Sequence, residues 1–316
     1  MKGSRLVYGS ADLRSDAVTG PLLDQFYEAG GRALDVANVY ADGESARAVG
    51  DWLALRGVRD EMVVYGKGCH PPYCSPSLVG DEVDKALEDL GIERLDVFML
   101  HRDDTSVAVE RFGEALLEQV RTGKIAGFGV SNWTMSRFRS LADFLAGTSD
   151  RLVAFSNHFS LGEMVTPTWP GCLSMTKGDI AELGDRGVDA LAWASLGAGY
   201  FAGRDAASWN SPENDARRSR ARELGDELGA APASVALAYV LHQPSHVLAL
   251  VGTRSRTHLE EALSACRITL TEGQLTRCPR PRRPGNGRPR EPARGSGVPR
   301  ARTALIRPGR RRSAPG

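Results

Sequence analysis

The sequence contains no apolar run long enough to cross a membrane. A transmembrane helix needs about 18 or more consecutive apolar residues, and no window of this chain of 316 residues approaches that. The opening Met1-Lys2-Gly3-Ser4 is followed only by a short apolar stretch that Gly9 interrupts, so the core of a secretory signal peptide is lacking. We therefore expect a soluble cytoplasmic protein with no membrane partner.

Cysteine is scarce and irregularly placed. The chain has five, which are Cys69, Cys74, Cys172, Cys266 and Cys278. An odd number at wide spacing in a long chain does not indicate a disulfide framework. The cluster Cys69-His70 with Cys74 is at most half of a metal site, because no second pair has the spacing of zinc ligands. We expect no metal.

Acidic and apolar residues are nearly absent from the last part of the chain. Residues 277–316 contain 13 Arg, one Glu and no Lys or Asp, a net charge of +12. Since the whole chain carries +1, residues 1–276 carry about −11. The Arg/Pro/Gly-rich segment has too few apolar residues to offset its ordering entropy, so we expect a disordered tail. Nonspecific nucleic-acid binding through phosphates is a weaker interpretation of its charge.

Short apolar runs alternate with amphipathic stretches along the body of the chain. Runs typical of strands are Arg5–Gly9, Arg32–Val36, Met62–Gly66, Arg94–Leu100, Ile125–Val130, Leu152–Ser156, Asp189–Ala194 and Val247–Val251. Helical spacing is found at Pro21–Ala29, Ser45–Leu55, Ser77–Leu90, Val107–Arg121, Met135–Leu145, Lys177–Arg186, Arg217–Leu228 and Thr257–Ala265, with a further helix at Pro232–His242. Eight strand–helix units in roughly 265 residues predict a parallel (β/α)8 TIM barrel.

A doubly wound sheet is the main alternative to the barrel. Such a sheet usually has a glycine-rich turn of the form G-x-G-x-x-G after its first strand. Gly9-Ser10-Ala11 follows the first predicted strand without that pattern. The nearest match, Gly197-Ala198-Gly199 with Gly203, has a last spacing one residue too long, and no acidic residue ends a following strand. We therefore predict a barrel over residues 1–276 and a tail over residues 277–316.

The carboxyl ends of barrel strands line the active site in this fold, which nominates residues by position. Asp35, Lys67 and His101 lie at the predicted ends of the second, third and fourth strands, and Tyr40 follows in the loop after the second. Further polar or flexible positions at later strand ends are Ser131, Asn132, Ser156, Ser195, Gly252, Thr253 and Arg254.

Four of these residues form a coherent acid–base set. A carbonyl group that accepts a hydride also needs a proton at its oxygen, and Tyr40 can donate one. The unperturbed pKa of tyrosine is about 10, and the Lys67 ammonium is expected to lower it while Asp35 holds Lys67 in place. A neutral His101 can hydrogen-bond the carbonyl. Each residue alone has an ordinary structural explanation, but the four together predict a reductase.

The surrounding motifs resemble those of the aldo-keto reductase superfamily over residues of about 5–276. Asp35-Val-Ala-Asn-Val-Tyr40 followed by Gly43 resembles its D-x-A-x-x-Y-x-x-G segment, and Lys67-Gly68 resembles its T-K-x strand end with Gly66 in place of Thr. Leu95–His101 is similar to the L-D-x-x-x-x-H strand, and Gly123–Asn132 to the G-K-I-R-x-x-G-x-S-N segment. The likeness continues through Trp193–Gly199 and Val251–Arg254.

The resemblance implies reduction of an aldehyde or ketone with NADP(H), which would lie across the barrel mouth. By matching position, Ser131, Asn132 and Ser156 would hold the nicotinamide carboxamide, and Ser195, Leu196 and Gly199 would line the pyrophosphate. Gly252, Thr253, Arg254 and Glu261 would meet the adenosine end, and Gly9, Ser10 and His258 complete the predicted cofactor set. An Arg254 guanidinium can pair with a 2′-phosphate, which favours NADPH over NADH.

Some features depart from the family pattern. The usual N-terminal hairpin is missing, because the first barrel strand begins at about Arg5, and the basic tail replaces the final helices. The abrupt change in composition indicates either a shifted reading frame or an unusual terminus. We assign His70, Trp133, Trp169 and Phe201 to the substrate pocket, with Trp209 as a further apolar candidate, although ordinary packing explains the aromatic residues equally well.

A second hypothesis keeps cofactor binding without chemistry. Some members of the superfamily are regulatory channel subunits that sense the redox state of nicotinamide, so a cofactor-binding regulator with little turnover is the alternative. The expected partner of the enzyme is a small carbonyl compound, and the sequence specifies no oligomeric state.

Overall fold

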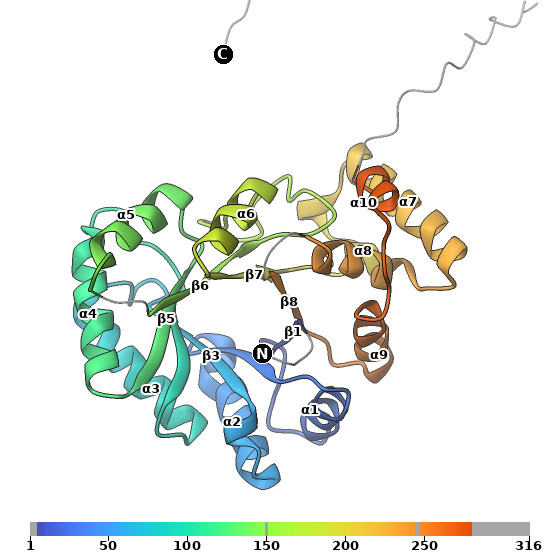
Figure 1. Ribbon diagram of the computed structural model, residues 1–316. Helices are drawn as coiled ribbons and strands as arrows, with labels where there is room; N and C mark the ends of the chain where they lie inside the picture. The colour runs from blue at the N-terminus through green and yellow to red at the C-terminus, as the bar shows by residue number, and fades with distance from the viewer. Residues whose placement is uncertain (1–4, 149–150, 244–246, 280–316) are drawn as a thin grey trace, which may run out of the picture. The chain divides into compact units, whose positions relative to one another are not determined.

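The computed structural model describes residues 5–148, 151–243 and 247–279. Its eight strands are parallel and close into a barrel in the order β1 to β8, and helices surround the strands (Figure 1). The predicted (β/α)8 fold is confirmed. The predicted disorder of the tail falls almost entirely outside the described residues.

Each strand lies close to its predicted place. The strands are Leu6–Gly9 (β1), Ala33–Ala37 (β2), Val63–Gly68 (β3), Leu95–Leu100 (β4), Ile125–Ser131 (β5), Leu152–His158 (β6), Asp189–Trp193 (β7) and Val247–Val251 (β8). The barrel closes because β1 pairs with β8, with Leu6 opposite Ala249. Alternate strand residues point inward, and Val7, Tyr65, Met99 and Leu191 belong to the apolar cluster that fills the barrel.

The outer apolar faces of the strands pack against the helices. The helices are Thr19–Glu28 (α1), Glu44–Arg56 (α2), Val79–Leu90 (α3), Val109–Arg121 (α4), Met135–Leu145 (α5), Lys177–Asp185 (α6), Pro212–Leu228 (α7), Pro232–Leu241 (α8), Arg256–Ala265 (α9) and Glu272–Arg277 (α10). In α3, for example, Val79, Val83, Ala86 and Leu90 are all buried, as their helical spacing predicts. Gly91 ends this helix in a left-handed conformation.

The structure adds elements that periodicity did not predict. Five short 3-10 turns occur at Tyr40–Gly43 (η1), Arg59–Glu61 (η2), Pro76–Leu78 (η3), Tyr200–Ala202 (η4) and Ala207–Trp209 (η5). Helix α7 begins five residues before its predicted start at Arg217, because the Ser211 hydroxyl accepts a hydrogen bond from the backbone N–H of Asn214 and Pro212 suits the first turn. The first turn of this helix is polar, so apolar periodicity does not indicate it.

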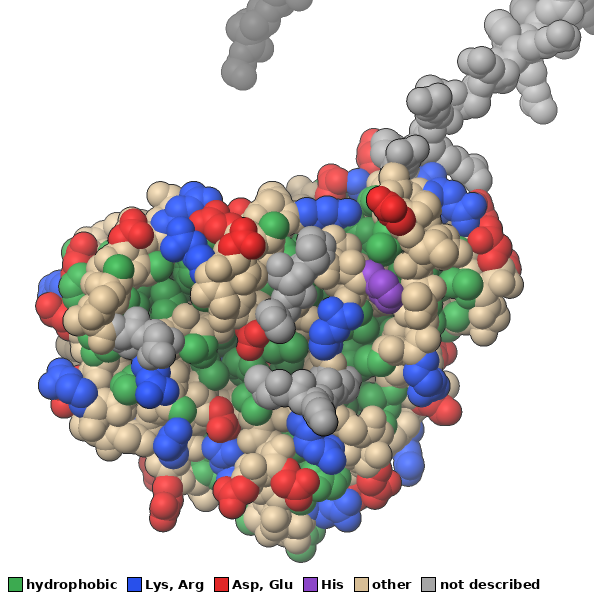
Figure 2. Space-filling view, viewed as in Figure 1, with side chains coloured by type: hydrophobic (Ala, Val, Ile, Leu, Met, Phe, Trp, Pro, Cys, Tyr) green, Lys and Arg blue, Asp and Glu red, His purple; other side chains and the backbone are tan. Residues whose placement is uncertain are grey.

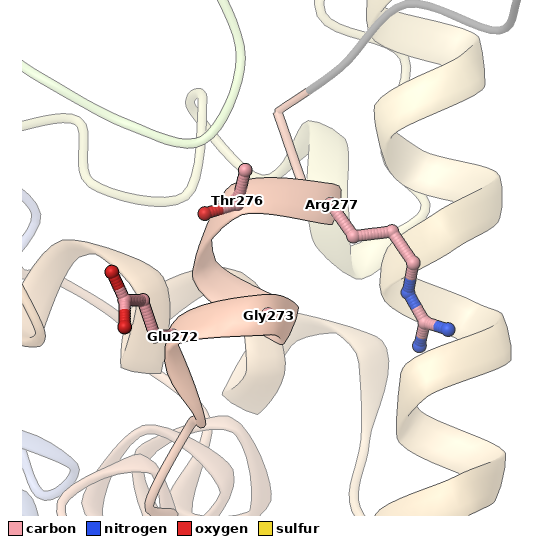
Figure 3. Close-up of a pocket in the computed structure, with 4 residues that line it drawn as sticks. All are labelled: Glu272, Gly273, Thr276 and Arg277. Carbon is pink, nitrogen blue, oxygen red and sulfur yellow. The ribbon is translucent and has the colours of Figure 1, made fainter.

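Helix α10 extends the packed body slightly past the predicted boundary at residue 276. Arg277 pairs with Glu227 of α7 at 3.0 Å, and Cys278 is buried. Figure 3 shows a surface pocket on this helix, lined by Glu272, Gly273, Thr276 and Arg277. It lies at the periphery of the helix layer (Figure 1), and none of the predicted site residues lines it.

The surface is mixed in charge. On the face drawn in Figure 2, positive and negative side chains are interspersed. Among the described residues, no helix is both long and apolar enough to span a bilayer. No disulfide bond joins any of the five cysteines in the described part of the chain.

Candidate active site

Three neighbouring strands and one short turn carry the predicted acid–base residues. Asp35 lies within β2, Lys67 within β3, and His101 directly follows β4. Strands β2 and β3 each run further than predicted, so Asp35 and Lys67 lie just inside the strands. Tyr40 begins the η1 turn that follows β2.

The η1 turn bends the chain so that Tyr40 returns over the strand it has just left. Ala41 and Asp42 have φ angles of 49° and 51°, and Gly43 has 84°. A side chain on Gly43 would be strained by this angle and would also approach the Asp89 carboxylate to 2.4 Å. The glycine of the D-x-A-x-x-Y-x-x-G pattern is therefore required by the turn.

The structure brings the four side chains together. The Lys67 Nζ lies 2.9 Å from Asp35 and donates a hydrogen bond of 2.8 Å to the Tyr40 hydroxyl. The Tyr40 hydroxyl is 3.5 Å from Asp35 Oδ2, and its ring meets the His101 ring edge-on at 5.9 Å between centroids. Asp35, Lys67 and His101 are buried, whereas Tyr40 is partly exposed.

The ion pair fixes the charge of Lys67. Burial opposes the charged ammonium, but the adjacent Asp35 carboxylate outweighs this effect and raises the pKa of Lys67 above its ordinary value. Lys67 is therefore a permanent cation at neutral pH. The Lys67 ammonium lies directly beside the Tyr40 hydroxyl oxygen, from which a proton would leave.

Lys67 acts on the pKa of Tyr40 in the expected direction, but the net pKa lies above its ordinary value. Burial raises this pKa, and the opposing effect of Lys67 is smaller. The phenol is therefore fully protonated at neutral pH, as a proton donor must be. Lys67 still favours the phenolate relative to a site without a cation.

The surroundings of His101 favour the neutral imidazole. Burial and the nearby cations Lys67 and Arg102 hold its pKa well below 6.5. Its Nδ1 is buried and has no hydrogen-bond partner among the described residues. A neutral imidazole with a free nitrogen can bind a polar atom of a ligand. The His70 ring stands 5.2 Å from it, so this predicted pocket residue is beside the site.

The predicted nicotinamide contacts lie together at the ends of β5 and β6. The Asn132 amide donates to Ser131 Oγ at 3.0 Å, and its backbone N–H donates to the Ser156 carbonyl at 3.0 Å. The Ser156 hydroxyl is buried without a partner in the described part of the chain. Asn132 has a φ of 57°, which turns its side chain away from the strand path.

The predicted pyrophosphate segment is a compact turn after β7. Ala194, Ala198 and Gly199 all have left-handed backbone angles. The Ser195 hydroxyl is used within the protein, because it donates to the carbonyls of Ala192 at 2.7 Å and Leu250 at 3.1 Å. The proton of the Ser195 hydroxyl is therefore already used within the protein, so this hydroxyl would meet a ligand only as an acceptor.

The predicted adenosine side joins the loops after β8 and β1. A side chain on Gly252 would approach the Gly9 carbonyl to 2.9 Å, so this crossing needs glycine. Arg254 pairs with Asp16 at 2.6 Å. Ser10 is buried and hydrogen-bonded to Ser45, and the Thr253 carbonyl accepts a hydrogen bond from the Tyr8 hydroxyl. On α9, His258 is exposed and Glu261 is half-buried.

The predicted aromatic pocket wall is largely wrong. Trp133 is completely buried, where its indole donates to the Arg102 carbonyl at 3.2 Å, and Phe201 is buried against Tyr200. Trp209 is likewise in the core, beside His158. All three rings belong to the main hydrophobic cluster. Trp169 is 61% exposed, so it remains available at the surface.

Two buried charged residues were missed by sequence reasoning. Glu82 of α3 accepts hydrogen bonds from the Cys69 backbone and the Asn38 side chain. Arg102, directly after His101, is also buried. Glu82 lies on the buried face of α3 together with the apolar residues of that helix, and this spacing could have identified it. Arg102 could have been identified because it directly follows His101.

Comparison with known proteins identifies the family of the chain. A sequence model of the aldo/keto reductase family matches residues 5–280. The 6-dehydroglucose reductase of Agrobacterium fabrum is 28% identical over 287 residues, which cover 84% of this chain and 90% of that protein. The NADP(+) aryl-alcohol dehydrogenase of Phanerodontia chrysosporium is 29% identical over 296 residues, covering 85% and 76%.

The fold has counterparts among solved structures. An aldo-keto reductase from Klebsiella pneumoniae in complex with NADPH superimposes with a TM-score of 0.70. The match covers 89% of this chain and 93% of that one at 21% identity. At this identity the likeness establishes the shared barrel.

Proposed function

Because the chain belongs to the aldo/keto reductase family, we propose that it reduces an aldehyde or ketone to an alcohol with NADPH, and that Tyr40 donates the proton. The observation that carries this proposal is the position of Lys67, whose ammonium lies within hydrogen-bond distance of both Asp35 and the Tyr40 hydroxyl. The two relatives described above are named as a reductase and an alcohol dehydrogenase, which supports the same class of reaction.

Tyr40, Lys67 and His101 have distinct roles in the proposed reaction. When bound, NADPH supplies a hydride to the carbonyl carbon. As the carbonyl oxygen gains negative charge, the Tyr40 hydroxyl transfers its proton to it, and the phenolate that remains is stabilised by the Lys67 ammonium at 2.8 Å. The neutral His101 donates a hydrogen bond to the same oxygen and so orients the carbonyl.

The strand ends offer suitable groups for the cofactor. The Ser156 hydroxyl is buried without a partner in the described residues, and Ser131 and Asn132 stand beside it, so these three would hold the nicotinamide amide. Arg254 would meet a 2′-phosphate at the opposite side of the mouth, where a guanidinium can bind phosphate by two hydrogen bonds. We therefore propose NADPH in preference to NADH.

The test is the substitution Tyr40→Phe, which removes only the acidic hydroxyl. Turnover of a panel of aldehydes should fall by about 100-fold or more, while NADPH binding, measured by fluorescence quenching, should be retained. Tyr73→Phe is the matched control, because Tyr73 is 54% exposed in the loop after β3.

Two outcomes would contradict the proposal. Undiminished reduction by Tyr40→Phe would remove Tyr40 from the chemistry. Tight NADPH binding by the unmodified protein with no turnover of any aldehyde or ketone would instead favour a cofactor-binding regulator.

A further inference from the structure

Among the residues that the structure describes, Arg102 is a buried cation without an anionic partner. Its residue is only 9% exposed, and no carboxylate of the described residues lies within salt-bridge distance. Its Nη1 is buried with no hydrogen-bond partner there, and Nη2 reaches only the Cys172 thiol at 3.7 Å, a weak acceptor. Burying a charge in this state is costly, so the arrangement calls for a compensating group.

The two carboxylates next to Arg102 in sequence are both engaged elsewhere. Asp103 forms a two-pronged ion pair with Arg137 at 2.8 and 3.0 Å. Asp104 accepts hydrogen bonds from the hydroxyl and backbone of Ser106 at 2.6 and 3.0 Å. Neither of these adjacent carboxylates therefore compensates the Arg102 guanidinium.

The position of Arg102 places this charge beside the reacting centre. It directly follows His101, and it is close enough to contribute to the low pKa of that imidazole. Its side chain reaches Cys172 in the segment that connects β6 to α6, over the carboxyl ends of the strands. Strand β4, which leads to Arg102, lies opposite β8 in the barrel order, so Arg102 is across the mouth from Arg254.

We propose that Arg102 binds an anionic group of the substrate, so that the preferred substrate is a carbonyl compound that also carries a carboxylate. The inference rests on the proposed reductase function, because it names the substrate class of that same site. A guanidinium can hold a carboxylate through two parallel hydrogen bonds, which would also orient the carbonyl toward Tyr40 and His101. The phosphates of NADPH are a second source of anionic oxygens, and the experiment separates the two.

The kinetic experiment compares two substrates of nearly equal shape. These are 4-carboxybenzaldehyde, which carries a carboxylate, and 4-formylbenzamide, which carries a neutral amide instead. The unmodified protein should prefer the carboxylate by roughly 10- to 100-fold in kcat/KM, the range expected for a charge-assisted hydrogen bond. Arg102→Gln should abolish this preference through a higher KM for the carboxylate alone, and Arg102→Lys should retain part of it.

Two controls test whether the preference for the carboxylate substrate comes from Arg102 and from substrate binding. Arg139→Gln removes an exposed cation that pairs with Glu182, and it should leave the preference intact. The KM for NADPH should be the same in Arg102→Gln as in the unmodified protein. An increase in the KM for NADPH with no change in substrate preference would overturn the proposal and assign Arg102 to the cofactor.

A binding experiment separates this inference from the proposed function. Calorimetric titration with 4-(hydroxymethyl)benzoate and with 4-(hydroxymethyl)benzamide needs no turnover. Binding of the carboxylate alone, lost in Arg102→Gln, supports the anion site even if no aldehyde is reduced. If neutral aldehydes are reduced but the carboxylate confers no advantage in either experiment, the anion site is wrong while the reductase function stands.

Discussion

The Glu82 carboxylate accepts a hydrogen bond of 2.8 Å from the backbone N–H of Cys69, which directly follows β3. The same carboxylate accepts from the Asn38 amide at 3.0 Å, and the Asn38 backbone donates to the Lys67 carbonyl at 2.9 Å. A single side chain of α3 thus joins the ends of the two strands that carry Asp35 and Lys67. We expect Glu82 to position Asp35 and Lys67 through these strand ends.

Replacing Glu82 with alanine should loosen these strand ends. Two buried donors would lose their acceptor, which should lower the free energy of unfolding by about 1–3 kcal/mol, measured by urea denaturation. The value of kcat should fall while NADPH affinity is kept. Glu88→Ala, at an exposed position of the same helix, should change neither quantity. Equal behaviour of the two variants would contradict the positioning role.

Removing the Lys67 ammonium should impair proton transfer. In Lys67→Met the phenolate loses its stabilising charge, so kcat should drop by about 100-fold or more. In the unmodified protein, the raised pKa of Tyr40 predicts that reduction slows only as the pH rises through a value above 10. Initial rates across pH measure both effects. Lys85→Met, which removes an exposed cation of α3, is the control. A Lys67→Met enzyme of normal rate would refute the role of this cation.

His158 should make the protein sensitive to mild acid. It is 2% exposed and hydrogen-bonds Ser174 and Ser160, and burial lowers its pKa from 6.5 to about 4. The unfolded state therefore takes up a proton first as the pH falls. The contribution to stability is complete above pH 6.5 and decreases toward pH 4, by about 2 kcal/mol at pH 4.5.

Denaturation curves at several pH values would measure this contribution. His158→Gln should remove that part of the pH dependence, although it lowers stability at neutral pH. His258→Gln, at an exposed histidine, should keep the full dependence. The assignment fails if the two variants show the same slope of stability against pH.

Arg254 should determine the choice between the two nicotinamide cofactors. Arg254→Gln removes the group that would pair with a 2′-phosphate, so the dissociation constant of NADPH should increase about tenfold while that of NADH changes little. Its present partner is the carboxylate of Asp16 at 2.6 Å, which shows that the guanidinium can hold an anion there. Fluorescence titration with both cofactors is the measurement, and Arg256→Gln is the matched control. An unchanged preference in Arg254→Gln would place the phosphate elsewhere.

The fold was predictable because its signals are local and repeated. Each strand is a short apolar run and each main helix has one apolar face, as in α3, so periodicity located them to within a few residues. Asp35, Lys67, His101 and Tyr40 were predictable because the barrel fixes which ends of its strands face the mouth.

What the sequence did not predict depends on three-dimensional packing. Ala41 and Asp42 adopt left-handed backbone angles although neither is a glycine, so the residue types did not indicate this turn. Trp133 follows a strand end in sequence, yet its ring lies in the core, where it packs against Phe112 and its indole N–H donates to the Arg102 carbonyl. The pKa of Tyr40 depends on how completely it is enclosed, and spacing along a chain carries no measure of enclosure.

The pairing of Leu6 with Ala249 also has a consequence during synthesis. The strands β1 to β4, which carry the four acid–base residues, emerge from the ribosome well before β8. Until β8 arrives, β1 keeps one edge of unpaired backbone groups, which is a template for association with other chains. The half of the barrel that carries the four acid–base residues is therefore exposed to association through this edge while the half that closes the ring is still being translated.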